Sequence, residues 1–183
     1  MVKRPLSIQT TIYQRRLQMD YVRAASFWIE KDKNTVKMPE QKCKAEIETF
    51  IHAHSTCALA VADGDFIRCT PLTYKYRMGK FYIFSEGGLK FRALAQNKHI
   101  ALAIYDEYKG PGSAKSLQVA GSAQVIGSDD ADYVPQLTAA HINAAHMQSL
   151  GLTLILITPH VMEYLNASLK DQGFGLRQTL HCP

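Results

Sequence analysis

The residues best suited to chemistry in this sequence are a lysine and the glycine pair that precedes it. Gly87-Gly88 is expected to turn the chain, and Lys90 then lies in the first turn of a short helix predicted over 89–97. Backbone amides at the start of a helix and a lysine ammonium both attract anions. The arrangement is typical of a phosphate-binding site, whereas the alternative is an ordinary solvated lysine.

A proline inside a predicted strand is the second unusual feature. Pro71 lies in the segment Cys69-Thr70-Pro71-Leu72-Thr73 and has no amide hydrogen to donate to a sheet ladder. Neighbouring backbone groups are therefore left free to bind a ligand. The alternative is a proline on an edge strand with no ligand beside it.

Histidine and cysteine spacing argues against a metal site. His52 and His54 are two residues apart and His141 and His146 are five apart, so neither pair has the i, i+4 spacing that places two ligands on one helix face. No C-x-x-C pair occurs. We expect no metal centre and four reduced cysteines, which are Cys43, Cys57, Cys69 and Cys182.

The formal net charge of +5 comes from the N-terminal part of the chain. Residues 1–44 hold 10 Lys and Arg against 4 Asp and Glu, whereas residues 45–183 hold 11 against 12. A basic segment of this kind can bind nucleic acid or an anionic surface, but it is more often a solvated helix face. Nucleic acid is therefore not the favoured partner. Salt-dependent binding that disappears on truncation of the segment would reveal it.

The apolar runs of the sequence are too short to cross a membrane. The longest, 57–62 and 152–157, have the length of strands and fall far short of the roughly 20 residues that span a bilayer. The first seven residues lack the apolar stretch of a secretion signal. We therefore expect a cytoplasmic protein without a membrane partner.

The secondary-structure elements that must position these residues are predicted to be helices before residue 57 and mainly strands after it. Before it, apolar residues at helical spacing predict one helix along the stripe from Ile12 to Trp28 and another over 39–54, with a polar connector over 31–37 between them. After it, short apolar or alternating runs separated by turn residues predict antiparallel strands, and 129–147 predicts a further helix. The strands are expected at 57–63, 66–76, 80–85, 99–106, 117–127 and 152–165.

The order of these features resembles a known family. Two hairpin strands are followed by a third strand ending in Ser85, a loop with Lys90, a helix ending in Gln96-Asn97-Lys98, and a strand that reads VAGSAQV over 119–125. This order resembles the flavin-binding split barrel of the pyridoxamine 5'-phosphate oxidase-like superfamily.

The resemblance implies the fold class and the domain organisation. The expected class is mainly β with flanking helices (α+β), built on a six-stranded antiparallel split barrel. This barrel would occupy 38–183 as the cofactor-binding domain, and 1–37 would form a helical appendage.

The resemblance also implies a cofactor, flavin mononucleotide (FMN), and the residues that hold it. Arg68 and Lys90 correspond to the two basic phosphate ligands, and Ser85 lies close to the same phosphate. The backbone of 69–73 lines the isoalloxazine ring, and Gln118 borders the cofactor. The expected cofactor-binding set is Arg68, Cys69, Thr70, Pro71, Leu72, Thr73, Ser85, Lys90 and Gln118.

The implied function is flavin-dependent oxidoreduction of a small molecule by a homodimer with the cofactor at the subunit interface. The apolar strand 152–157 is expected to be buried in that interface. Because flavin itself transfers the hydride, the sequence need not show a general acid or base, and we name no catalytic residue. Leu89 stands where many relatives carry an arginine, so one phosphate contact is missing.

Two alternatives and one unassigned motif stay open at this point. Some relatives on this fold bind haem, which a Soret band would reveal. A non-enzymatic protein that binds a partner or nucleic acid through residues 1–44 is the other alternative. The motif Gly173-Phe174-Gly175 either covers a flat ligand or is a packed terminal turn, and it does not match the substrate motif of the vitamin B6 oxidases.

Overall fold

The structure is a computed structural model that describes residues 20–110 and 112–182. It divides between Val36 and Lys37 into two units. The first contains helix α2 (Tyr21–Asp32), which begins where the Asp20 carboxylate accepts a hydrogen bond from the Arg23 amide at 2.9 Å. The predicted stripe from Ile12 to residue 19 lies outside the described part of the chain. None of the described helices is long and apolar enough to span a membrane.

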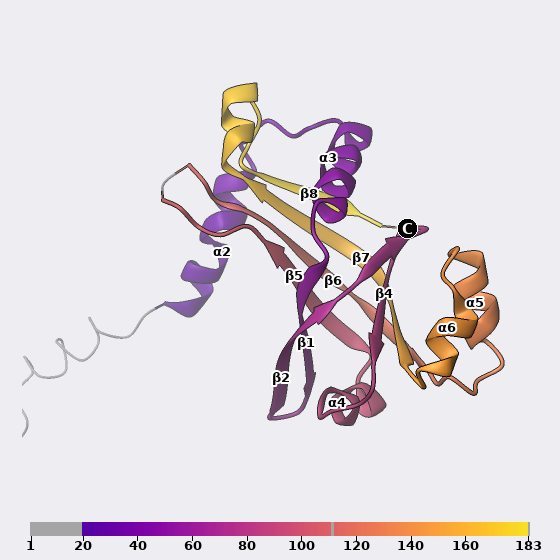
Figure 1. Cartoon of the computed structure of the whole chain (residues 1–183). Coiled ribbons are helices and arrows are strands. Elements are labelled where there is room, and N and C mark those ends of the chain that lie inside the picture. The colour runs from indigo at the N-terminus through magenta and orange to yellow at the C-terminus, as the bar shows by residue number, and fades with distance from the viewer. Residues whose placement is uncertain (1–19, 111, 183) are drawn as a thin grey trace, which may run out of the picture. The chain divides into compact units, whose positions relative to one another are not determined.

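The second unit is a curled antiparallel sheet with helices packed against it (Figure 1). Its strands are β1 (Thr56–Asp63), β2 (Phe66–Thr73), β3 (Lys75–Arg77), β4 (Lys80–Ser85), β5 (His99–Tyr105), β6 (Lys115–Ile126), β7 (Thr153–Asn166) and β8 (Arg177–His181). Its helices are α3 (Glu40–His52), α4 (Lys90–Gln96), α5 (Tyr133–Ala139), α6 (Ala144–Ser149) and the 3-10 helix η1 (Ala167–Gln172).

The predicted fold class, mainly β with flanking helices, is confirmed, but the sheet has eight strands instead of six. The strand predicted over 66–76 is divided at Tyr74, whose hydroxyl donates a hydrogen bond to Ile51 O at 2.7 Å. Strand β8 was not predicted. It forms where Gln178 and Leu180 alternate with exposed residues and pair with β7.

The sheet closes on itself because its two outermost strands are consecutive in the chain. The strand order is β2-β1-β5-β6-β7-β4-β3, so the single residue Tyr74 connects one edge of the sheet to the other. Strand β3 pairs only with Lys80–Tyr82 of β4. The rest of β4 has no strand on that side among the described residues, and it faces β2. The barrel is therefore split between β2 and β4.

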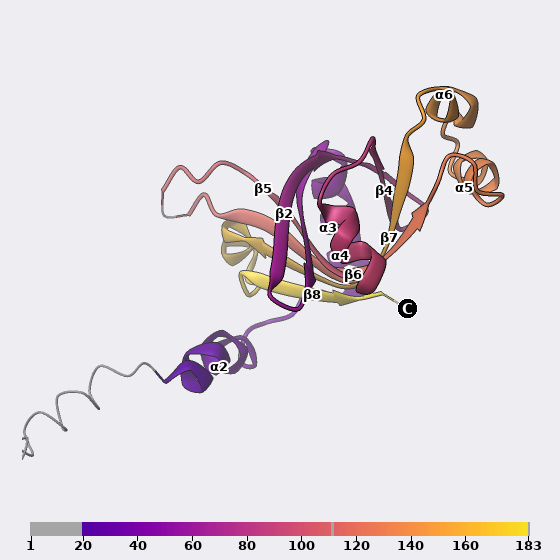
Figure 2. The ribbon, with the colours of Figure 1, turned by 90° about the horizontal axis from the view of Figure 1, so that it is seen from below.

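Two helices close the ends of the barrel core. Figure 1 shows α3 at one end of the sheet and α4 at the other, and Figure 2 shows β2, β4 and β6 on different sides of α4. The buried face of α3 carries Ile47, Phe50 and Ile51 at helical spacing. Burial of each such side chain contributes about 1.5–3 kcal/mol, whereas the N-cap residue Pro39 makes no capping hydrogen bond. Core packing therefore holds this helix in place.

A second apolar cluster covers the other face of the sheet at one end. Tyr133 and Leu137 of α5 are fully buried there with residues of β4, β6 and β7. The single helix predicted over 129–147 is interrupted, because Ile142 also turns into this cluster and His141 adopts a φ of 55°. Asn143 then caps α6 by accepting a hydrogen bond from the His146 amide.

The apolar strand 152–157 is buried within the chain itself. Leu154, Ile155, Leu156 and Ile157 are at most 2% exposed, because β4 and β6 flank them and the two apolar clusters cover both faces. The expectation that a subunit interface buries this strand is therefore corrected.

Strands β6 and β7 leave no room for a side chain at Gly121. The register between them shifts there, since Ala120 pairs with Val161 and Gly121 pairs with Pro159. A Cβ atom on residue 121 would lie 2.4 Å from the carbonyl oxygen of Thr158. Only glycine fits this crossing without a backbone shift.

Candidate functional site

The split in the barrel brings together the three residues predicted to bind phosphate. Arg68 lies on β2, Ser85 ends β4, and Lys90 begins α4. Arg68 pairs in register with the buried Val61, so its side chain is on the inner face of the sheet. The pKa of Lys90 is lowered by burial and by the positive charge of Arg68, so the field of one cation reaches the other.

The turn between β4 and α4 is organised around these side chains. The Ser85 hydroxyl donates to Gly87 O at 3.1 Å, and the Gly87 amide donates to the Ser85 Oγ at 3.3 Å. The Lys90 ammonium donates to the same Gly87 carbonyl. At Gly88, where φ is 109°, a Cβ would lie 3.4 Å from Lys90 Nζ. The Gly-Gly turn therefore wraps around the ammonium group.

The electrostatics of this turn favour an anion. Lys90 is 5% exposed, and burial together with the nearby Arg68 lowers its pKa from the ordinary value of 10.5. Within residues 20–110 and 112–182, no carboxylate forms an ion pair with either cation. Two like charges close together in a partly desolvated place are unfavourable unless an anion joins them. The site is therefore suited to a phosphate group.

Neighbouring residues shape the rest of the site. A shallow pocket of about 510 Å³ is lined by Phe84, Ser85, Glu86, Gly87 and Leu152. Leu152 was not predicted, because it reaches the turn only through the pairing of β7 with β4. Arg92, three residues after Leu89, lies with its guanidinium 4.7 Å from the centre of the Phe66 ring.

The other predicted residues are divided between the two faces of the sheet. Thr70 and Leu72 lie on the inner face with Arg68, whereas Cys69, Pro71 and Thr73 alternate with them on the outer face. β2 lies at the edge of the sheet, so the missing amide hydrogen of Pro71 does not interrupt the hydrogen bonds between any other pair of strands.

Gln118 lies on the outer face and apart from the phosphate end. It pairs with Ala103, which pairs with Ala58, which in turn pairs with Pro71. Three strand spacings therefore separate Gln118 from Pro71, roughly 14 Å. The structure does not bring Gln118 to Lys90.

The C-terminal glycine-aromatic motif is a packed turn. Phe174 packs against the barrel core, and the Lys42 ammonium lies 4.6 Å from the centre of its ring. Gly173 ends η1 in the left-handed conformation with a φ of 82°. Of the two alternatives for this motif, the structure shows the packed turn.

Comparison with known proteins identifies the family. Solved structures with the same fold include a FAD-binding protein from Mesorhizobium loti (20% identity, TM-score 0.53, 70% of this chain and 95% of that chain covered). Another is a protein of the pyridoxinephosphate oxidase family from Clostridium acetobutylicum (14%, 0.53, 70% and 91%), and a third is a heme-binding protein from Mycobacterium smegmatis (15%, 0.53, 73% and 55%). No curated protein matches the sequence. The sequence model of the pyridoxamine 5'-phosphate oxidase family matches residues 43–166, and the chain therefore belongs to that family.

Proposed function

We propose that this protein binds FMN, with Arg68, Ser85 and Lys90 around the phosphate, and acts as a flavin-dependent oxidoreductase. The observation that carries the proposal is the pair of cations at the split, which no described carboxylate neutralises. A phosphate dianion neutralises both, and each charge-assisted hydrogen bond contributes about 1.5–3 kcal/mol.

The role of the chain in this proposal is binding and orientation. Bound flavin supplies hydride transfer, and the protein supplies electrostatics and position. Thr70 and Leu72 lie on the inner face of β2, which is the edge strand beside the split. They follow Arg68 along this strand, away from the phosphate turn. These are the groups that we assign to the flavin ring.

The choice of cofactor is tested by comparing the affinities of FMN, riboflavin and FAD, which share the isoalloxazine ring. Riboflavin lacks the phosphate, and FAD extends it, whereas the sequence has no Gly-x-Gly-x-x-Gly loop for a pyrophosphate. Titration followed by flavin fluorescence should show FMN binding at least 100-fold more tightly than riboflavin and more tightly than FAD. Equal or tighter binding of FAD contradicts the choice of cofactor. A Soret band in the purified protein, in place of flavin absorbance, contradicts the function itself.

The pH dependence of FMN affinity should report on Lys90. Its pKa in the free protein is below 10.5, and a bound phosphate raises it, so binding takes up a proton when the pH exceeds the free value. FMN affinity should therefore fall as the pH rises, beginning below pH 10.5. Lys90→Arg keeps its charge at every pH tested and should remove this decline. A parallel decline in both proteins would assign it to another group.

The homodimer in this proposal is supported by the outer face of the sheet. Small apolar side chains from three strands lie side by side there. Ala101 and Ala120 are exposed, and Ala58, Ala60 and Ala103 beside them are half-buried. A patch of small apolar side chains suits a second copy of the chain.

Disruption of this face tests the dimer. We expect sedimentation of the parent at micromolar concentration to give twice the mass of 20.5 kDa and Ala101→Arg to give the monomer, because a bulky charge cannot be desolvated in the interface. Ala145→Arg, on the exposed part of α6, is the matched control and should leave the dimer intact. A monomeric parent refutes the dimer.

A further inference from the structure

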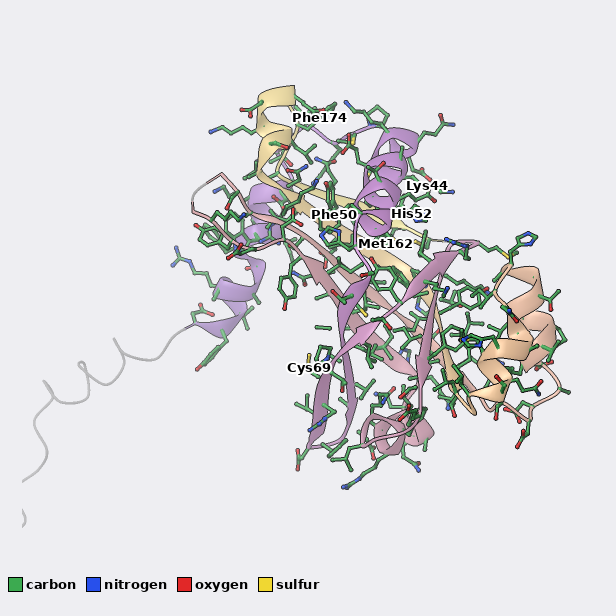
Figure 3. All side chains as sticks on the ribbon, viewed as in Figure 1. Lys44, Phe50, His52, Cys69, Met162 and Phe174 are labelled. Atoms are coloured by element: carbon green, nitrogen blue, oxygen red, sulfur yellow. The ribbon has the colours of Figure 1, made fainter. Side chains whose placement is uncertain are left out.

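A second cavity lies where β7 changes its pairing partner. β7 pairs with β4 over Thr153–Ile157 and with β8 over Val161–Leu165, and the residues between them leave a wedge. Residues of α3 line one side of this wedge, and the cavity has a volume of about 340 Å³, which is in the range of small-molecule sites. Figure 3 shows Lys44 on α3 and Met162 on β7 at this place.

This cavity is separate from the phosphate site. It begins at Lys80, at the start of β4, whereas Ser85 ends the same strand. Five strand residues span roughly 16 Å.

The floor of the cavity is apolar and rich in sulfur. Ile47, Tyr76, Met162 and Leu180 are all buried, at most 8% exposed. Three sulfur-bearing residues, Met78, Met162 and Cys182, line the cavity together with Tyr76. Thioether and aromatic groups make favourable contacts with aromatic rings.

Tyr76 supplies a hydroxyl group among the residues that line this apolar space. Tyr76 is 7% exposed, its ring packs on Phe81 at 4.8 Å, and its hydroxyl makes no hydrogen bond within the described part of the chain. Burial and the nearby Glu48 and Cys182, both of which line the cavity, raise the pKa of Tyr76 to about 12. The hydroxyl therefore stays protonated and can both donate and accept a hydrogen bond.

The charges at the rim cancel. Lys44 and Lys80 are matched by Glu40 and Glu48, so the cavity does not favour an ion of either sign. We propose that it binds a small, uncharged aromatic molecule whose single hydroxyl or carbonyl group forms a hydrogen bond with Tyr76. This site does not depend on the flavin assignment.

The test compares two probes that differ by one hydroxyl group. 2-Naphthol should bind the parent, and Tyr76→Phe should weaken its binding about 2- to 12-fold, the effect of one neutral hydrogen bond. Naphthalene cannot use the hydroxyl, so its affinity should be the same in both proteins. FMN affinity should also be unchanged in Tyr76→Phe. Equal loss of both probes, or displacement of 2-naphthol by FMN, overturns the proposal.

Cysteine alkylation gives a second readout in the unmodified chain. Cys182 lines the cavity, whereas Cys69 is exposed on β2 and lies far from Met162 in Figure 3. Saturating 2-naphthol should slow the reaction of Cys182 with iodoacetamide at least several-fold and leave the rate at Cys69 unchanged, as measured by peptide mass spectrometry. An unprotected Cys182, or equal slowing at both sites, contradicts binding in this cavity.

Discussion

Replacing Arg68 and Lys90 together by alanine is expected to weaken FMN binding by two to four decades. Each side chain is assigned a charge-assisted hydrogen bond to the phosphate, worth about 1.5–3 kcal/mol, so the pair contributes about 3–6 kcal/mol. Every 1.4 kcal/mol is a factor of ten in affinity. Fluorescence titration with FMN measures the loss, and riboflavin affinity should hardly change because that flavin has no phosphate.

The free protein should not lose stability in this double variant. Lys90 is buried beside another cation, so removing both groups relieves repulsion, and thermal melting without flavin should occur at the parental temperature or above it. The control variant carries alanine in place of Lys109 and Lys170, which are both exposed. It loses the same total charge and therefore measures how far long-range electrostatic attraction contributes to FMN binding. A folded double variant with parental FMN affinity would show that the phosphate is bound in another place.

Substituting Gly121 by alanine is expected to destabilise the barrel by about 1–3 kcal/mol. The added Cβ would meet Thr158 O at 2.4 Å and Pro159 Cα at 3.2 Å, and both are backbone atoms that cannot rotate away. For a chain of this size the melting temperature should fall by roughly 2–12 °C.

A second glycine provides the matched control. At Gly127 an added Cβ would meet only the Asp130 carboxylate, at 3.3 Å, and this side chain, which accepts a hydrogen bond from the Gly127 amide, needs to shift by only a few tenths of an ångström. Gly127→Ala should therefore melt within about 2 °C of the parent, since a surface change of this kind costs at most about 0.5 kcal/mol. Similar melting of the two variants would mean that β6 and β7 do not cross as closely as described.

The local elements of this fold could be predicted because neighbouring residues specify them. The strand predicted over 57–63 is found at Thr56–Asp63, and the turn at Met78-Gly79 has the positive φ values, 53° and 74°, that such a turn requires. The bend at Tyr74 could not be predicted, because it depends on a hydrogen bond to Ile51, 23 residues away. Strand β8 depends in the same way on its pairing with β7.

The candidate site likewise depends on residues that are far apart in the sequence, and this part of it could not be predicted from local patterns. The Gly-Gly turn and Lys90 give a local signal, but Arg68 joins them only because the sheet curls, which the family resemblance implied and spacing alone did not. The side chains of Cys69 and Pro71 lie on the outer face of the sheet, so the expectation that 69–73 lines the ring concerns the backbone of this segment. The cavity at Tyr76 has no local signal, since its walls come from five separate elements.

The position of β7 also decides when this protein can fold during synthesis. β4 ends at Ser85, but the strand that covers its long edge begins at Thr153. At about 5–20 residues per second, the roughly 70 intervening residues take about 3–14 s to emerge from the ribosome. Throughout that time the edge of β4 is an open template for other nascent chains. The edge of β4 is therefore covered only after β7 has been made, late in synthesis.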